Sequence, residues 1–137
     1  MSRQLEVVSS HAGHDNTPKQ FRLYRRYIST QDLVLISRHI LGVQPLSSPY
    51  KMIAADVNNS RSITTLDLIF LRRLLLGIDI EFETNTSWRF VELDYAFPNP
   101  ANPWQEPFPE RIDIILPAAG VSDLDFVAVK VGDVSLD

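Results

Sequence analysis

The stretch that decides the fold is a helical pattern that occurs twice. Residues 63–78 read ITTLDLIFLRRLLLGI, and residues 28–43 read ISTQDLVLISRHILGV. The two stretches align at an offset of 35 residues without a gap, and seven of the sixteen positions are identical. Four of the nine other positions exchange one aliphatic residue for another. An internal repeat of this kind predicts that one short helical unit is used twice.

Each repeat carries signals for the start and the end of a helix. A favourable N-cap residue is followed three residues later by an aspartate, as in a capping box, and a glycine stands at the C-terminal end. These positions are Ser29, Asp32 and Gly42 in the first repeat and Thr64, Asp67 and Gly77 in the second. Apolar stripes at helical spacing are Leu33, Ile36, Ile40 and Leu41, and Leu68, Leu71, Leu74 and Leu75. Helices of about ten residues are unstable alone, so we expect these stripes to pack against each other or against the tail.

A twelve-residue pattern of oxygen-bearing side chains precedes the second helix. Its positions 1, 3, 5 and 12 are Asp56, Asn58, Ser60 and Asp67. A calcium loop uses these positions, because Ca²⁺ needs about six to eight oxygen ligands that converge on one point. Position 7 would supply the backbone carbonyl of Ser62, and position 9, Thr64, would act through a water molecule. The spacing therefore predicts one calcium site made by this loop.

Two departures from the usual loop predict a modest affinity. Position 6 is Arg61, where a sharp turn favours glycine, and position 5 is Ser60, a weaker ligand than aspartate. Only two carboxylates remain, which predicts a dissociation constant of about 10⁻⁴ to 10⁻³ M. Each half of the pattern also has an ordinary alternative: Asp67 alone would be a helix cap, and residues 56–59 alone would be a turn.

Residues 56–77 resemble a type I dockerin repeat, and residues 28–42 resemble the helix half of the other repeat of that family. Dockerins pair two short calcium loops, each followed by one helix (the F-hand). Residues 46–51 and 97–134 also look like parts of dockerin-like modules in large secreted proteins of gliding and marine Bacteroidetes. The resemblance implies a non-catalytic, calcium-stabilised module that docks onto cohesin domains, often in polysaccharide degradation.

The resemblance also implies a partner-binding face on the two helices. The matching positions are Thr65, Leu66, Arg72 and Arg73 in the second repeat, and Thr30, Gln31, Ser37 and Arg38 in the first. The alternative for these residues is an ordinary solvent-exposed helix surface.

The first repeat lacks the calcium loop that the resemblance implies. Residues 21–28, where that loop should begin, read FRLYRRYI, with no carboxylate and three arginines that would repel Ca²⁺. We therefore predict that the first site is lost, that Asp32 remains as a cap, and that residues 21–27 extend a helix or pack as an aromatic arm. Residues 132–137, GDVSLD, resemble the opening of such a loop. Either the chain is a fragment of a longer protein, or this end supplies ligands to an incomplete site elsewhere, which a metal at Asp133 and Asp137 would support.

Composition narrows the function classes. The 137 residues carry a net charge of -4, with +3 on residues 1–50, +2 on 51–78 and -9 on 79–137. The absence of cysteine excludes disulfides, thiolate zinc sites and cysteine nucleophiles. Nucleic-acid binding is disfavoured because the basic cluster at residues 22–26 stands alone. No apolar run approaches the roughly 20 residues of a membrane helix, so membrane insertion is not expected. The sequence contains neither a phosphate-binding glycine loop nor a nucleophile elbow, so neither of these motifs indicates an enzyme.

The expected fold class is mainly α with an irregular or β tail: a dockerin-like pair of loop-helix (EF-hand-like) units plus a short β-containing C-terminal extension. We expect a flexible arm at 1–20, the helical repeat module at 21–78 and an acidic extension at 79–137 that packs on it. Six of the nine prolines lie within residues 98–117 of this extension. Residues 125–131 alternate as a strand does, and residues 111–116 could pair with them.

The expected setting is an extracellular or cell-surface protein of which this chain is a part. Residues 1–6 are not followed by the apolar stretch of a secretory signal, which a truncated or mis-started gene or an excised segment would explain. One alternative function is a carbohydrate-binding or adhesive module that uses Trp88 and Trp104 as platforms. Another is a metal-free structural spacer.

Overall fold

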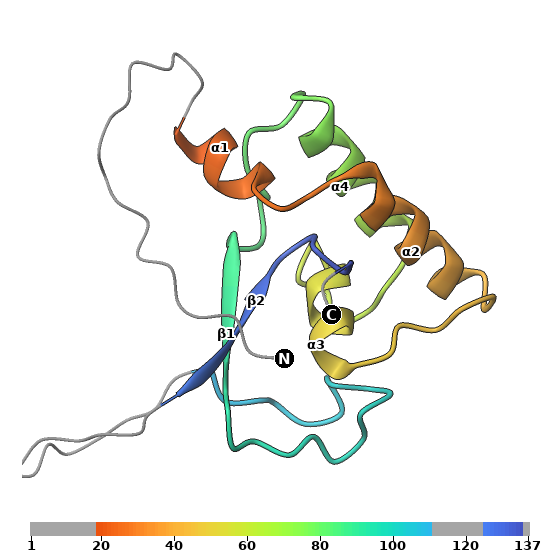
Figure 1. The fold of residues 1–137 in the computed structure, drawn as a ribbon, viewed down its shortest axis with the longest axis vertical. Helices are drawn as coiled ribbons and strands as arrows, with labels where there is room; N and C mark the ends of the chain where they lie inside the picture. The colour runs from red at the N-terminus through yellow and green to blue at the C-terminus, as the bar shows by residue number, and fades with distance from the viewer. Residues whose placement is uncertain (1–18, 111–124, 136–137) are drawn as a thin grey trace, which may run out of the picture.

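Residues 19–110 and 125–135 are described by a computed structural model of the chain (Figure 1). These ranges contain the helices α1 (Lys19–Arg25), α2 (Thr30–Ile40), α3 (Pro49–Ala55) and α4 (Thr65–Leu75), and the strands β1 (Trp88–Glu92) and β2 (Phe126–Lys130). Figure 1 shows α2 beside α4, while α3 lies between these helices and the two-stranded sheet. The fold is therefore a small mixed one, with more helix in the described ranges than the two repeats alone predict.

The structure confirms the predicted ends of the two repeat helices. Ser29 and Thr64 are the N-caps and have extended backbone conformations. Gly42 and Gly77 follow the C-caps with positive φ angles of 71° and 73°. In each case the next residue donates from its backbone N–H to a carbonyl five residues earlier, which closes the helix end with a Schellman pattern. The duplicated sequence thus folds as a duplicated helix.

The apolar stripes of α2 and α4 face each other and form the centre of the core. Ile36, Leu71 and Leu74 are completely buried. The prediction was wrong for Leu41, which is 75% exposed. Leu41 is the C-cap of α2, so it follows the last helical turn and no longer lies on the face that the helix buries.

Helix α3 lies between the two repeats, in a stretch for which the sequence analysis predicts no helix. Ser48 caps its N-terminus by accepting a hydrogen bond from the Lys51 N–H at 3.1 Å, and Pro49 stands at its first position. Its residues 52–55 are buried, and two of them are alanines that let neighbouring backbones approach closely. Because α3 ends directly before Asp56, it fixes where the predicted calcium loop begins.

The predicted strand at residues 125–131 is confirmed as β2, but its partner is different. β2 pairs antiparallel with β1, so that Trp88 lies opposite Lys130 and Glu92 lies opposite Phe126. Residues 111–116, the predicted partner, lie outside the described residues. The stretch that contains β1 was interpreted only as acidic and aromatic, although Phe90 and Val91 favour a strand.

A buried lysine joins the sheet to α1. Lys130 is 1% exposed, and its Nζ donates to the backbone carbonyls of Tyr24 at 2.7 Å and Val131 at 3.0 Å. The hydroxyl of Ser87 donates to the carbonyl of Leu23 at 3.0 Å. The carbonyls at the C-terminal end of a helix are favourable partners for a positive charge, which offsets part of the cost of burying the ammonium group.

The limits of the predicted units remain predictions. Residues 1–18 of the expected arm lie outside the described residues, and α1 begins at Lys19. Among residues 19–110 and 125–135, no helix is long and apolar enough to cross a membrane.

Substituting Leu71 should show how much the contact between α2 and α4 contributes to stability. We expect Leu71→Ala to lower the free energy of unfolding by about 2–5 kcal/mol, because it opens a cavity at a fully buried position. Leu66→Ala, a matched change on the same helix at a position that is 45% exposed, should cost less than about 1 kcal/mol. Urea denaturation followed by circular dichroism measures both. Equal losses would contradict the packing described here.

Candidate metal centre

The predicted calcium loop lies between α3 and α4 and has a carboxylate at each end. Asp56 follows the last residue of α3, and Asp67 lies in the first turn of α4. Both side chains are completely buried. A buried carboxylate needs several donors or a cation, so the neighbours of these two groups decide what the loop can do.

Each carboxylate accepts hydrogen bonds from backbone N–H groups of the loop. Asp56 Oδ1 accepts from the N–H of Ser60 at 2.9 Å, and its Oδ2 accepts from the N–H of Arg61 at 2.8 Å. Asp67 Oδ1 accepts from the N–H of Asn58 at 3.1 Å, and its Oδ2 accepts from the N–H of Thr64 at 2.8 Å. These bonds fold the loop around the two carboxylates and bring both ends of the twelve-residue pattern together.

The side chain of Asn58 lies in the middle of a cluster of oxygen atoms. Its amide oxygen is placed 2.8 Å from Asp67 Oδ1, 3.1 Å from Asp56 Oδ1 and 2.8 Å from Ser60 Oγ. Oxygens this close repel one another unless a cation lies among them or the amide turns by 180° and donates from its nitrogen. Hard oxygen donors converging on one point are the set that Ca²⁺ prefers.

The structure thus brings together four of the predicted ligands: Asp56, Asn58, Ser60 and Asp67. The carbonyl of Ser62 lies beside this cluster, since it accepts from Ser60 Oγ at 3.3 Å. Thr64 has a different contact, because its Oγ1 accepts from the N–H of Leu66 at 3.3 Å and so caps α4. Within the described part of the chain, no group of three or more His, Cys, Asp or Glu side chains could hold a metal. A cation here would depend on neutral oxygens as well as on two carboxylates.

The backbone of the loop is left-handed at two non-glycine residues. Asn59 has a φ angle of 57°, which asparagine tolerates, and Arg61 has a φ angle of 65°. Arg61 stands at position 6, where the sequence pattern leads one to expect glycine. The loop therefore keeps the usual sharp turn, at a backbone cost of about 1–2 kcal/mol for a side chain with a Cβ.

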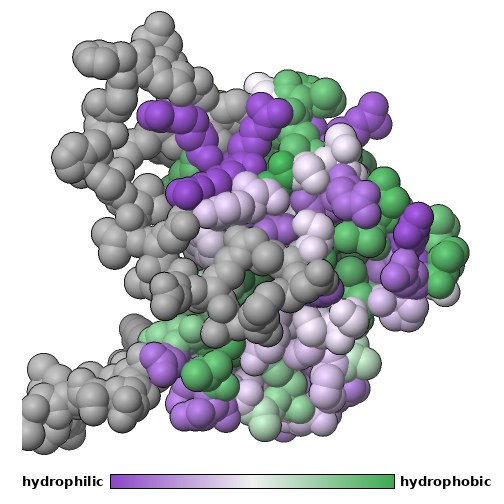
Figure 2. Space-filling view, viewed as in Figure 1, coloured by the Kyte–Doolittle hydropathy of each residue, from purple (hydrophilic) through white to green (hydrophobic). Residues whose placement is uncertain are grey.

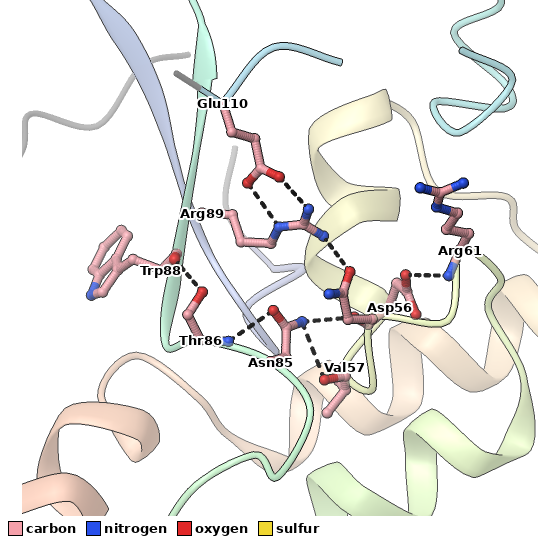
Figure 3. A network of polar contacts seen from close by, with 9 residues as sticks. Asp56, Val57, Arg61, Asn85, Thr86, Trp88, Arg89 and Glu110 are labelled. Carbon is pink, nitrogen blue, oxygen red and sulfur yellow. Dashed lines mark hydrogen bonds and ion pairs between the residues drawn. The ribbon is translucent and has the colours of Figure 1, made fainter. Parts of the chain in front are cut away.

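The C-terminal extension holds the outside of the loop, and the sequence reasoning did not identify this contact. Asn85 Nδ2 donates to the carbonyls of Asp56 at 3.1 Å and Val57 at 3.2 Å (Figure 3). The hydroxyl of Thr84 donates to the carbonyl of Asn58 at 2.7 Å. The polar run at residues 84–86 was the available signal, but only the fold shows which carbonyls it satisfies.

Arg89 adds a charged contact to the same edge of the loop. Its Nη1 donates to Asn59 Oδ1 at 2.9 Å, and its other nitrogens form a two-point ion pair with Glu110 (Figure 3). A cavity of about 300 Å³ opens beside these groups, and Trp104 and Phe108 contribute to its wall. The loop is therefore fixed from both sides, by α4 within the repeat and by residues 84–89 outside it.

Burial raises the pKa of Asp67 to about 6. The charge of Asp56 raises this pKa further, whereas the N–H groups of Thr64 and Asn58 lower it. The loss of hydration therefore exceeds the gain from hydrogen bonding in the metal-free loop. A divalent cation would favour the charged carboxylate and reverse this balance.

The residues predicted for the partner face lie on the surfaces of α2 and α4. Seven of the eight are exposed, and Ser37 is half-buried, with its hydroxyl donating to the carbonyl of Leu33 at 2.7 Å. Arg73 forms an ion pair with Asp79, with Nε 2.8 Å from Oδ2. In the space-filling view, hydrophobic side chains reach the surface near the ends of α4 and α2 (Figure 2). They include Leu41, Val43, Leu76, Ile78 and Ile80, all exposed.

Residues 26–76 match the family model of the type I dockerin domain. This segment is similar to type I dockerin domains. The match contains α2, α3, the loop and α4, and thus the first repeat and all but the last two residues of the second. Dockerin domains are non-catalytic modules that bind calcium and dock onto cohesin domains, and they occur in extracellular proteins. Neither the curated proteins nor the solved structures gave a significant match to this chain.

Arg61→Gly tests the backbone strain in the dockerin loop. We expect this change to raise the free energy of unfolding by up to about 1 kcal/mol, because glycine adopts a positive φ without steric cost. Arg61→Ala is the matched control, since it removes the same charge but keeps a Cβ. Urea denaturation in the presence of a chelator measures both variants. A gain of the same size in Arg61→Ala would attribute the effect to charge and contradict strain.

The raised pKa of Asp67 predicts that the stability of the metal-free protein falls as the pH rises. A carboxyl whose pKa is higher in the folded state binds more protons there, so its contribution to stability is largest at low pH and falls as the pH rises from about 4 to about 6. We therefore expect this group to favour a higher melting temperature for the chelated protein at pH 5 than at pH 7. Asp67→Asn should reduce the change in melting temperature between pH 5 and pH 7. If Asp67→Asn leaves the pH dependence of the melting temperature unchanged in chelator, the raised pKa of Asp67 is contradicted.

Proposed function

We propose that this chain is a calcium-stabilised protein-docking module of an extracellular or cell-surface protein, and that it binds one Ca²⁺ in the loop of residues 56–67. The observation that carries the proposal is that the side chains of Asp56, Ser60 and Asp67 gather around the side-chain amide of Asn58, within 2.8–3.1 Å of it. The match of residues 26–76 to the dockerin family model supports it. The affinity should be modest, because only two of these ligands carry charge.

Calcium would act by fixing the start of α4. Asp56, Asn58, Ser60, Ser62 and Asp67 are the proposed ligands, and Thr64 would contribute through a water molecule. Asp67 belongs to the first turn of α4, so a cation that holds its carboxylate also holds the helix that carries Arg72 and Arg73. Binding free energy then adds to the free energy of folding.

The proposed docking face is formed by the repeated positions of α2 and α4. Thr30 and Thr65 are equivalent in the two repeats, as are Gln31 and Leu66, and all four side chains are exposed. Ser37, Arg38, Arg72 and Arg73 complete the face. The partner would be a cohesin-like protein, and a role in polysaccharide degradation within a secreted assembly is part of the proposal. No catalytic step is proposed for this chain.

Thermal unfolding with calcium and with chelator tests the metal part of the proposal. We expect about 10 mM Ca²⁺ to raise the melting temperature by about 5 °C or more, since ligand in excess of its dissociation constant stabilises by a few kcal/mol. Asp56→Ala should abolish this response. Asp79→Ala is the matched control, because it removes a partly exposed carboxylate that pairs with Arg73 and lies outside the loop of residues 56–67. A wild-type protein that does not respond to Ca²⁺ would leave the metal-free spacer as the better explanation.

Binding to cohesin domains tests the docking part separately. A panel of isolated cohesin domains can be titrated with the chain in Ca²⁺ and in chelator by calorimetry. Arg38→Glu and Arg72→Glu change exposed residues of the proposed face and should weaken binding without altering the melting temperature. Binding that persists in both variants would place the interface elsewhere.

The carbohydrate-binding alternative has one supporting observation. Trp104 contributes to the wall of the 300 Å³ cavity, and its Nε1 is buried without a hydrogen-bond partner. Trp88 is less suited to a sugar platform, because its half-buried ring packs edge-on against Tyr27 with 6.2 Å between ring centroids. A glycan array with the wild type and Trp104→Ala separates this alternative from protein docking.

A further inference from the structure

The segment that follows β2 ends at the first turn of α2. The backbone N–H groups of Val134 and Ser135 donate to Asp32 Oδ1 at 2.9 and 3.1 Å. The N–H of Ser29 donates to Asp32 Oδ2 at 2.8 Å. Asp32 is completely buried. Its carboxylate is therefore held on one side by the N-cap of its own helix and on the other side by residues more than 100 positions away.

The second repeat holds its equivalent carboxylate in the same way. Asp67 Oδ2 accepts from the N-cap Thr64 at 2.8 Å, as Asp32 Oδ2 accepts from the N-cap Ser29. Asp67 Oδ1 accepts from the N–H of Asn58 at 3.1 Å, the distance found between Ser135 and Asp32. Asn58 is position 3 of the contiguous loop. Ser135 thus stands in the first repeat where position 3 stands in the second.

We propose that the first dockerin loop of this chain is discontinuous, with residues 131–135 forming its opening and residues 28–32 forming its end. The sequence supports this arrangement independently of the contacts. Residues 133–137 followed by residues 26–32 read DVSLDRYISTQD, and residues 56–67 read DVNNSRSITTLD, with six of twelve positions identical. The stretch at 21–28 has no loop ligands because the opening of the loop comes from the other end of the chain.

The contacts of Gly132 support the assignment of residues 131–135 to the opening of the first loop. Gly132 has a φ angle of 93°, and a Cβ there would lie 2.8 Å from Ile28 Cδ1 and 2.9 Å from Leu71 Cδ1. Ile28 is the equivalent of Ile63, the apolar residue at position 8 of the contiguous loop. A side chain at this position would have to displace both methyl groups and would strain the backbone at this φ angle, so glycine is favoured here.

The two loops also contact each other at corresponding places. The N–H of Gly132 donates to the carbonyl of Ala54 at 2.8 Å, so the residue just before Asp133 is joined to the residue two positions before Asp56. Val134 and Val57 follow these aspartates, and both are buried, with 1% and 0% exposure. The two openings thus lie side by side in the core, as two copies of one structural unit would.

This inference concerns how the docking module is completed, and it does not depend on calcium. The Asp32 carboxylate already accepts from three backbone N–H groups, and the proposal assigns no ion to it. Its functional consequence lies on α2, because Thr30 and Gln31 belong to the turn that the segment holds. The proposed docking face would therefore require residues that lie outside the 26–76 family match.

Amide hydrogen exchange on the full chain, followed by NMR in chelator, tests the proposal directly. In the wild type we expect the amides of Val134 and Ser135 to exchange as slowly, within about tenfold, as those of Asn58 and Thr64. Exchange at the rate of an unstructured peptide at Val134 and Ser135, with the rest of the core protected, would overturn the proposal. This measurement needs no variant, so it remains decisive if a substitution prevents folding.

A pair of equivalent substitutions makes the test specific. Asp32→Asn should speed exchange at Val134 and Ser135 by about tenfold or more and leave Asn58 little changed. Asp67→Asn is the matched control from the other repeat. It should speed exchange at Asn58 and leave Val134 and Ser135 little changed. Unchanged exchange at Val134 and Ser135 in a folded Asp32→Asn protein would overturn the discontinuous loop. The calcium response of the wild type is measured separately, so a failure of the metal proposal does not affect this outcome.

Discussion

Two buried carboxylates, Asp32 and Asp67, connect the first turns of the repeat helices to the rest of the molecule. Each accepts one hydrogen bond from the N-cap of its own helix and at least one from a segment outside that helix. Burial raises the pKa of both groups, so the backbone donors only partly replace the lost hydration. An acidic side chain that is costly to bury and satisfied only in one geometry selects that geometry strongly, which is how these residues position both helices.

The extension after α4 is part of the same polar network. Asn85 satisfies the carbonyls of Asp56 and Val57, and Lys130 places its ammonium group against the end of α1. Asn85 thus adds hydrogen bonds from outside the 26–76 match to two carbonyls of the loop, and Lys130 adds one to the carbonyl of Tyr24 in α1. Because unpaired buried polar groups cost several kcal/mol, residues beyond the family match contribute to the stability of the segment within it.

Local signals in the sequence were enough for the repeat helices and for the order of the candidate ligands. Caps, apolar spacing and the twelve-residue pattern all act within one turn or one loop, so they can be recognised without the fold. Helix α3 was missed because a helix of only seven residues that begins at a Ser-Pro pair looks like a linker. The pairing of β1 with β2, the burial of Lys130 and the contacts of Asn85 join residues far apart in the sequence. No local pattern encodes such contacts, and the sequence therefore gave no specific signal for them.

The same reasoning explains how one repeat can lose the continuity of its loop and keep its geometry. The N–H that serves Asp67 comes from 9 residues away, whereas the N–H of Val134 that serves Asp32 comes from 102 residues away. For a flexible chain, closing the longer loop costs only about 2 kcal/mol more, because the entropy grows with the logarithm of length. Burying Val131 and Val134, which are 0% and 1% exposed, contributes about 1.5–3 kcal/mol each. The burial of these two side chains therefore offsets the added closure entropy, so the segment does not need to be contiguous with α2 to lie against Asp32.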